Sequence, residues 1–384
     1  MTAYTPVADL AAIPRPTSTS ATGDRARGRR SRGSGALAIR VAALVVVAAL
    51  PVAFSAWVDP ARLVTSRSAE REIARVLASG RNVTDVANYD DRAIEKNLAP
   101  MRLRRAEVLV LGSSRMQPLR AAAFGHATFV NGAMQGGVLD DMLGVYALHD
   151  APGRRPNRVV LGVDPWTESY AGDAGWGSLA EERAMMLGRI GVPVSPLRDR
   201  LALGLRAART VASPDYFRLA VHSFRQHGAG GIAWRVTDQQ QNAEKTRLPD
   251  GSVVWSALPP DNAIVAARAF AEQGLAHDAR FHDLAHRASG RRDALERFVR
   301  YLGDEGVSVT LVLVPFPAEV YDASRRMSGD SLAASERAYR ALGARTGARV
   351  IGSYDPRDAG VETRDFFDED HLRPEALARL VSGR

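Results

Sequence analysis

A long apolar segment near the N-terminus limits what this chain can fold into more than any other feature. It runs from Ala36 to Trp57, twenty-two residues interrupted only by Arg40 and Pro51. A helix needs about 20 mostly apolar residues to cross a bilayer, so the segment predicts one membrane-spanning helix. Five arginines lie between residues 25 and 32, and positively charged flanks stay in the cytoplasm. We therefore predict a single-pass anchor over residues 36–57, with the later residues on the extracytoplasmic side of the cell membrane.

A cleaved signal peptide is the alternative interpretation of this segment. Cleavage after Ser55 would place a small residue, Ala53, at the −3 position of the cleavage site. A chain that has lost its N-terminus in this way would be a soluble secreted lipase rather than an anchored protein.

The charge distribution argues against a nucleic-acid-binding protein. The formal net charge is +8, but residues 1–40 contain seven arginines and two aspartates and so carry +5 of it. The rest is spread over more than three hundred residues, without the concentrated basic patch that a duplex-binding face needs. We expect no nucleic-acid partner.

The residue types available also argue against a metal site. The chain has no cysteine, which excludes disulfides, thiol catalysis and cysteine-bound zinc. His282 and His286 have the His-x-x-x-His spacing of helical zinc sites, with His277 nearby, but no third ligand is evident. We expect an ordinary helix surface there, no metal and no cofactor.

Strand and helix patterns divide the remaining chain. Residues 1–35 lack apolar periodicity, which predicts a disordered cytoplasmic tail, and residues 58–103 predict a helical lead-in. In residues 104–384, nearly continuous apolar runs alternate with helical patterns, which predicts the α/β class. The expected architecture is a three-layer α/β/α domain with a mostly parallel five-stranded sheet. The predicted strands are Val108–Leu111, Ala127–Val130, Arg158–Val163, Val307–Val314 and Ala348–Ile351. The predicted helices are Leu139–Leu148, Asp293–Leu302, Leu332–Leu342 and Pro374–Val381.

A long segment between the third and fourth predicted strands has no long strand pattern. Structureless loops of such length are uncommon, so we predict a mainly helical insertion over about residues 167–288. It includes a helix over Asn262–Ala276 and a turn at Pro249–Ser252.

Polar residues follow four of the predicted strands, at the edge of the sheet where open α/β proteins bind ligands. Ser114 follows the first strand, Asn131–Gly137 the second, Asp164 the third, and Asp368 and His371 the fifth. A serine becomes a good nucleophile when a histidine takes its proton and a carboxylate orients the histidine. Each stretch alone has an ordinary explanation as a turn or a capped helix start. Together they predict a catalytic serine, histidine and aspartate.

Two short motifs, Gly112-Ser113-Ser114-Arg115 and Asp368-x-x-His371, resemble those of the SGNH (GDSL-type) hydrolases. The resemblance covers about residues 104–384, and the insertion has no counterpart in it. The resemblance implies a flavodoxin-like SGNH fold. It assigns Ser114 as nucleophile, His371 as base and Asp368 as the acid that orients the base.

The resemblance also implies an oxyanion hole made by the N–H groups of Ser114 and Gly136, with Asn131 as a supporting residue in the same loop. The anchor and the motifs resemble a membrane-anchored bacterial branch of cell-envelope acyl-transfer proteins, including those that D-alanylate teichoic acids. This resemblance implies a serine esterase or acyltransferase that acts on O-acyl groups of envelope polysaccharide through an acyl-enzyme. The implied partners are the membrane, a cell-envelope glycan or acylated substrate, and a membrane-bound acyltransferase.

Asp164 departs from the family pattern, which has a side-chain oxyanion donor, asparagine, at that position. An ionised carboxylate cannot donate a hydrogen bond and repels a developing oxyanion, unless it is protonated, turned away or neutralised by a cation. We expect Arg115 to pair with Asp164 and to present positive charge near the oxyanion site; Arg115 could instead bind an anionic acceptor. The departure also supports an alternative, a catalytically inactive SGNH-like binding or scaffold protein that assists a membrane acyltransferase.

Overall fold

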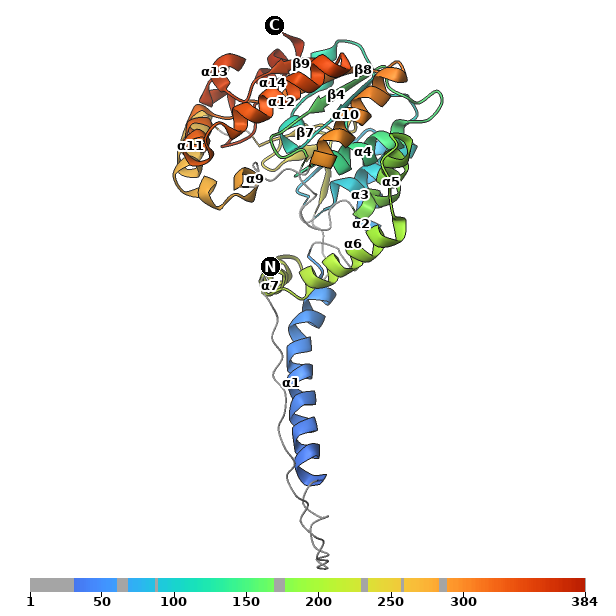
Figure 1. Cartoon of the computed structure of the whole chain (residues 1–384), viewed down its shortest axis with the longest axis vertical. Coiled ribbons are helices and arrows are strands. Elements are labelled where there is room, and N and C mark those ends of the chain that lie inside the picture. Colours follow the sequence, from blue (N-terminus) through green and yellow to red (C-terminus); the bar gives the residue numbers. More distant parts are fainter. Residues whose placement is uncertain are drawn as a thin grey trace, which may run out of the picture. The chain divides into compact units, whose positions relative to one another are not determined.

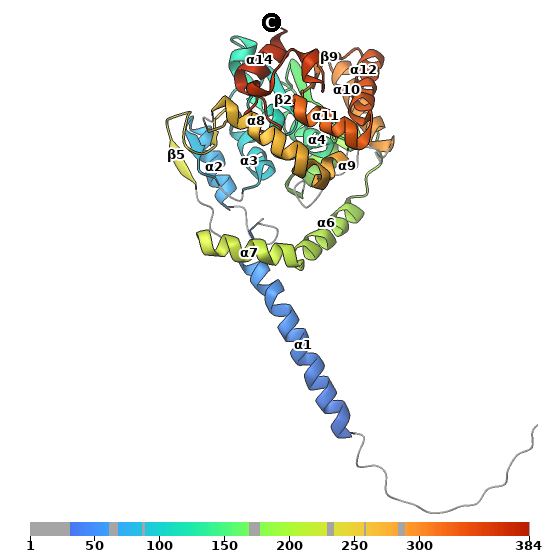
Figure 2. The same cartoon turned by 90° about the vertical axis from the view of Figure 1, so that its left-hand side faces the viewer.

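The computed structural model, shown from two sides in Figures 1 and 2, describes residues 31–60, 68–86, 89–168, 177–228, 234–256, 259–282 and 289–383. The chain divides into two compact units, residues 1–50 and residues 51–384. The predicted lead-in and the predicted α/β domain therefore belong to one unit. Most of the predicted tail, residues 1–30, lies outside the described residues.

Helix α1, Ser31–Val58, contains the predicted anchor and begins before Ala36. Its window Leu37–Val58 has 22 residues and a mean hydropathy of 2.5. Pro51 lies inside the helix, and membrane-spanning helices tolerate the loss of one backbone donor at such a position. The prediction of one N-terminal helix that is long and apolar enough to span a membrane is confirmed.

The main sheet has five strands in the order β3-β2-β4-β8-β9, and every neighbouring pair is parallel. In chain order, this is the arrangement 2-1-3-4-5. The strands are β2 Val108–Leu111, β3 Phe129–Asn131, β4 Arg158–Gly162, β8 Ser308–Leu313 and β9 Arg349–Gly352. The predicted α/β class and five-stranded parallel sheet are confirmed. The carboxyl ends of all five strands meet at one edge of the sheet.

Helices cover both faces of the main sheet because alternate strand side chains point to opposite faces and both sets are apolar. Leu109 and Leu111 of β2 belong to a core shared with α4, α10 and α12. Val108 and Val110 belong to a second core, shared with α14. These four helices are α4 Leu139–His149, α10 Ser289–Asp304, α12 Ser331–Thr346 and α14 Pro374–Ser382.

A second, antiparallel sheet was not predicted. Its order is β5-β1-β6-β7, so that β1, Asn82–Thr84, lies between strands from a distant part of the chain. The other strands are β5 Arg235–Thr237, β6 Thr246–Arg247 and β7 Val253–Val254. Helices α2, Ser68–Ala78, and α3, Asp91–Leu98, share a small apolar core with β1. The lead-in is therefore built into the same unit as the main sheet.

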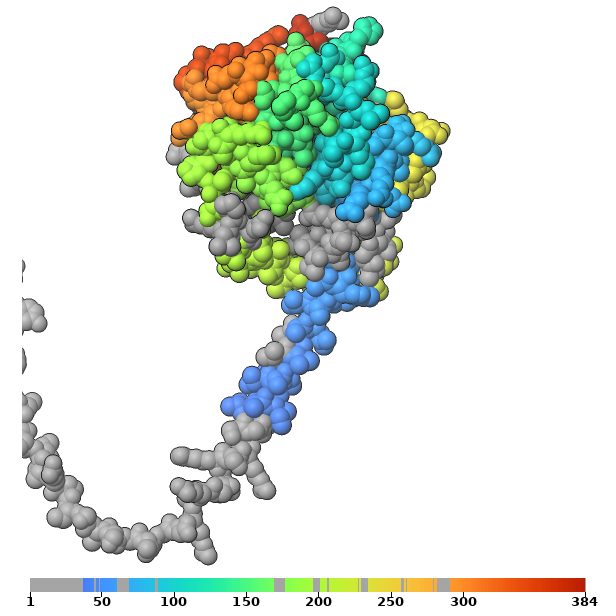
Figure 3. Space-filling model, turned by 90° about the vertical axis from the view of Figure 1, so that its right-hand side faces the viewer, coloured from blue at the N-terminus to red at the C-terminus, as the bar shows by residue number. Residues whose placement is uncertain are grey.

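The described part of the segment between β4 and β8 is mostly helical, and it also supplies β5, β6 and β7. The predicted helix Asn262–Ala276 appears as α8, followed by a π turn, Phe270–Gly274, and a 3₁₀ turn, Leu275–His277. The remaining helices are α5 Ala180–Arg189, α6 Pro196–Val211, α7 Pro214–His227, α8 Pro260–Ala269, α9 Ala279–His282, α11 Ala318–Ser328 and α13 Pro356–Ala359. In the space-filling view, the green to yellow-green segments from α5 to α7 lie at the surface (Figure 3).

Candidate active site

A tight turn at the end of β2 places Ser114 at the carboxyl edge of the main sheet. Gly112 has φ 155°, and a Cβ there would lie 2.8 Å from Cγ of Met116, so a larger residue would not fit. The chain then enters a 3₁₀ turn, Ser114–Met116, whose first residue is the predicted nucleophile. The turn exposes Ser114 in part, while Ser113 and Arg115 on either side are buried.

Ser114, His371 and Asp368 form a continuous hydrogen-bonded chain. Ser114 Oγ lies 2.9 Å from Nε2 of His371, across 257 residues of sequence. His371 Nδ1 lies 2.9 Å and 3.0 Å from the two carboxylate oxygens of Asp368. This geometry lets Nε2 accept the serine proton while Asp368 holds the proton on Nδ1. The prediction that these three side chains meet is confirmed.

The Asp368 carboxylate is held in its charged form. Burial alone would raise the pKa of Asp368, but the hydrogen bond and the charge of His371, together with two backbone N–H groups, lower it below its usual value. Those N–H groups belong to Asp370 and His371 and lie 2.9 Å and 2.8 Å from Oδ1. The Asp-x-x-His spacing therefore forms a local turn that fixes both side chains.

Trp255, which is not among the predicted site residues, packs on the histidine. Its ring centre lies 4.2 Å from that of His371 and 5.8 Å from that of Phe367. Lys245 Nζ lies 3.4 Å from the centre of the same indole ring. Both residues come from the small sheet region, 110 or more residues before His371 in sequence. No local motif marks them, because only the tertiary fold brings them to this edge.

Arg115 pairs with Asp164, as predicted, with Nη1 2.7 Å from Oδ1. The guanidinium is fully buried and donates further hydrogen bonds to the backbone oxygens of Asp370, Val314 and Pro315. The alternative that Arg115 binds an anionic acceptor is therefore wrong, and the expectation that its charge lies near the oxyanion site stays a prediction. Its donors are directed at the protein interior, where they tie the serine turn to the segment after β8.

Asp164 has both carboxylate oxygens engaged below the site. Oδ2 accepts a hydrogen bond of 2.5 Å from Ser113, the residue that replaces the aspartate of the family motif. Burial raises the pKa of Asp164, and Arg115 and Ser113 oppose this rise. Asp370 continues the network, since it lies 3.0 Å from Nε of Arg115 and 2.6 Å from Nη1 of Arg280. Asp164 thus supports the serine turn and offers no donor to a substrate.

The loop that carries Gly136 is held by helix α3 of the lead-in. Asp91 accepts a hydrogen bond of 2.8 Å from the N–H of Gln135, and Arg92 donates one of 3.1 Å to the Gln135 carbonyl. A Cβ on Gly137 would lie 2.4 Å from the Gly112 carbonyl oxygen, so this loop lies directly against the serine turn. Among the described residues, no acceptor takes the N–H of Gly136 or of Ser114. The predicted oxyanion hole requires such unpaired N–H groups, and it stays a prediction.

Asn131 holds the segment after Ser114 in place through side-chain hydrogen bonds. It is fully buried, and Nδ2 donates to the carbonyls of Met116, Gln117 and Leu119. Its Oδ1 accepts from the N–H of Ala133. All of its side-chain polar atoms are therefore used, and it supports the site without facing a substrate.

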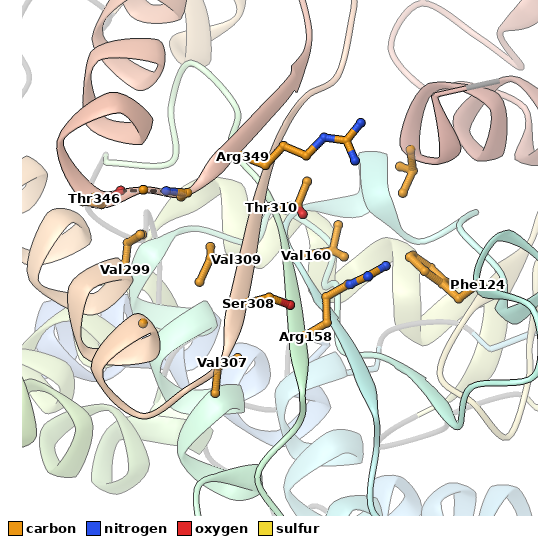
Figure 4. Close-up of a pocket in the computed structure, with 14 residues that line it drawn as sticks. Phe124, Arg158, Val160, Val299, Val307, Ser308, Val309, Thr310, Thr346 and Arg349 are labelled. Atoms are coloured by element: carbon orange, nitrogen blue, oxygen red, sulfur yellow. Dashed lines mark hydrogen bonds between the residues drawn. The ribbon is translucent and has the colours of Figure 1, made fainter.

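Two cavities of about 360 Å³ each lie at different places on the domain. One is lined by Arg158, Ser308 and Arg349, the first residues of their strands, and therefore lies at the amino edge of the main sheet, opposite Ser114 (Figure 4). The other is lined by Gln135, which precedes Gly136 in sequence, and by Lys245, which lies over the Trp255 ring. Burial lowers the pKa of Lys245, and the charge of Asp368 opposes this shift.

No group of three or more potential metal ligands occurs in the part of the chain that the structure describes. The predicted helix surface at His282–His286 lies mostly outside that part, because residues 283–288 are not described.

No protein-family model matches this chain, and no curated protein matches it.

Proposed function

We propose that the protein is a serine-dependent ester hydrolase or O-acyltransferase of the SGNH type, with a flavodoxin-like fold. The observation that carries the proposal is the aligned chain from Ser114 through His371 to Asp368. The strand order 2-1-3-4-5 and the position of Ser114 directly after the first strand of the sheet support the same family.

In the proposed reaction, Ser114 Oγ attacks an ester carbonyl carbon while its proton passes to Nε2 of His371. The carbonyl oxygen becomes an oxyanion, which accepts hydrogen bonds from the N–H groups of Ser114 and Gly136. The ester C–O bond then breaks, and His371 returns the proton to the leaving alkoxide. Water or a glycan hydroxyl next attacks the acyl-enzyme, with His371 again taking and returning a proton.

The proposed substrate is an O-acylated polysaccharide of the cell envelope. Helix α1 supports this, because an anchor over Leu37–Val58 would keep the site close to membrane-linked glycans. The arginines between residues 25 and 32 favour a cytoplasmic N-terminus and an extracytoplasmic site. The cavity beside Gln135 and Lys245 is the proposed place for the acyl group or the acceptor.

A non-catalytic binding or scaffold protein that assists a membrane acyltransferase is the second candidate. The engagement of Asp164 by Arg115 and Ser113 favours it, because the site then has two backbone oxyanion donors and no side-chain donor from this position. Losing one such donor typically costs about 10²–10³ in rate.

A fluorescent phosphonate and an acetyl ester distinguish the two candidates. The enzyme is expected to be labelled and to hydrolyse the ester, and Ser114→Ala should abolish labelling and lower kcat/KM by about 10⁴-fold or more. Ser308→Ala, at the opposite edge of the sheet, is the matched control and should retain both activities. A wild-type protein that is folded, binds polysaccharide and neither labels nor hydrolyses would establish the scaffold instead.

A further inference from the structure

Helix α6 carries apolar residues on two opposite sides. Leu203 packs against the main core of the domain. Leu201 and Leu205, one turn apart, are 59% and 62% exposed, and both are two positions from Leu203. Two positions along a helix turn a side chain by about 200°, so these leucines form a stripe on the face away from the core. A helix of a water-soluble domain normally places such a stripe inward.

Helix α7, which follows α6, packs against the end of α1 within the unit of residues 51–384. The ring of Phe54 lies 5.8 Å from that of Phe217 and 5.7 Å from that of Phe224. Tyr216 donates a hydrogen bond of 2.8 Å from its hydroxyl to Asp59. Figure 2 shows α6 and α7 following one another along one side of the domain.

These contacts determine where α7 lies if α1 spans a bilayer. A span of 22 residues is about 33 Å long at 1.5 Å per residue, close to the ~30 Å thickness of the hydrocarbon core. Phe54 and Trp57 near its end then lie at the boundary between hydrocarbon and headgroups, where tryptophan is enriched. Phe224 contacts both rings, so α7 lies at the same level.

The two helices have the charge of a membrane-surface segment. Residues 196–227 contain six arginines and two aspartates. Arginines attract anionic headgroups, and their aliphatic parts cover apolar surface while the guanidinium stays in the polar layer. Phe224 and Leu219 of α7 add exposed apolar area, at 40% and 44% exposure.

We propose that α6 and α7 form a membrane-surface platform that binds a bilayer containing anionic lipid. Leu201 and Leu205 enter the boundary between headgroups and acyl chains, and the net positive charge of residues 196–227 attracts anionic headgroups. The platform gives the domain a second attachment beside its single span and restricts its rotation relative to the membrane. This inference is independent of the proposed ester chemistry.

The absence of cysteine makes site-specific labelling simple. Leu201→Cys and Leu205→Cys carry a nitroxide in the full-length protein, reconstituted in vesicles of phosphatidylcholine and phosphatidylglycerol. Ala344→Cys, an exposed position on α12, is the control. Collision with oxygen, which concentrates in lipid, is compared with collision with a water-soluble nickel chelate. Both leucine positions should favour oxygen, and position 344 should favour nickel.

The platform would be overturned if both leucine positions were as accessible to nickel as position 344. This comparison applies to variants that keep the thermal unfolding of the wild type. Spectral broadening at position 205 that disappears on dilution with unlabelled protein would also overturn it, since a second copy would then cover the stripe. In vesicles of phosphatidylcholine alone, the oxygen preference should fall. An unchanged preference would overturn the role of anionic headgroups.

Discussion

At the scale of single residues, the fully buried Arg115 guanidinium joins the serine turn to two carboxylates, Asp164 and Asp370. Removing one partner of a buried ion pair leaves the other charge without compensation, which typically costs about 3–5 kcal/mol. We expect Arg115→Met to lower the free energy of unfolding by this amount in denaturant titrations. Arg345→Met, which removes a largely exposed pair with Glu296, should cost at most about 1 kcal/mol. Equal losses in the two variants would contradict the structural role of Arg115.

Trp255 is expected to act as a positioning residue, because its ring limits how the His371 imidazole can turn. If the proposed ester hydrolysis is correct, Trp255→Ala should lower kcat by about 10²-fold with little change in KM, since small misplacements of a catalytic group are costly. Trp255→Phe keeps a planar ring and should recover most of kcat. An equal fall of kcat in both variants would indicate that the fold is lost rather than that His371 is misplaced.

The sequence allowed some of these residues to be predicted and not others. Ser114, Asp368 and His371 lie in short motifs whose spacing has a direct chemical meaning, so the residues themselves indicate the site. Trp255 and Asp91 act through contacts with segments far away in the chain, and a tryptophan or an aspartate alone indicates no partner. The pairing of Arg115 with Asp164 was predictable because both follow neighbouring strands of one parallel sheet.

At the scale of elements, α3 and α4 are joined by buried titratable groups. Nε2 of His149 in α4 lies 3.4 Å from Oε1 of Glu95 in α3. Burial lowers the pKa of His149, although Glu95 opposes this shift. For Glu95, burial alone would raise the pKa, but Arg102 and His149 lower it overall.

These shifts predict how stability depends on pH. A histidine with a lowered pKa stays neutral in the folded chain, whereas the unfolded chain binds a proton below about pH 6.5. Stability should therefore fall as pH decreases from about 6.5, by at most about 1.4 kcal/mol per pH unit for this group. His149→Gln should flatten this slope in denaturant titrations between about pH 6.5 and 5. The exposed His126→Gln should leave the slope as in the wild type; an unchanged slope in both variants would contradict the argument.

Element length explains which parts of the fold were predictable. The main strands were predictable because each is a run of apolar residues that parallel sheets bury on both faces. β5, β6 and β7 have two or three residues each, too few to show an alternating pattern. The second sheet depends on pairing between β1 and residues more than 150 positions away, which no local pattern reveals.

At the scale of the whole molecule, the lead-in is part of the folded unit, so the place of truncation should matter. A chain that begins at residue 68 keeps α2, β1 and α3, whereas one that begins at residue 104 loses the strand between β5 and β6. We expect the first to unfold cooperatively in a thermal scan and to react with the phosphonate. The second should lose the cooperative transition. Retention of both properties by the shorter chain would show that the lead-in is dispensable.

The separation of Ser114 from His371 by 257 residues has a consequence during synthesis. After Ser114 has left the ribosome, most of the domain must still be synthesised before His371, its hydrogen-bond partner, exists. Any product that terminates before His371 lacks the imidazole that lies against the Ser114 hydroxyl in the folded chain. If the proposed ester chemistry is correct, a nascent chain acquires it only after translation has passed His371.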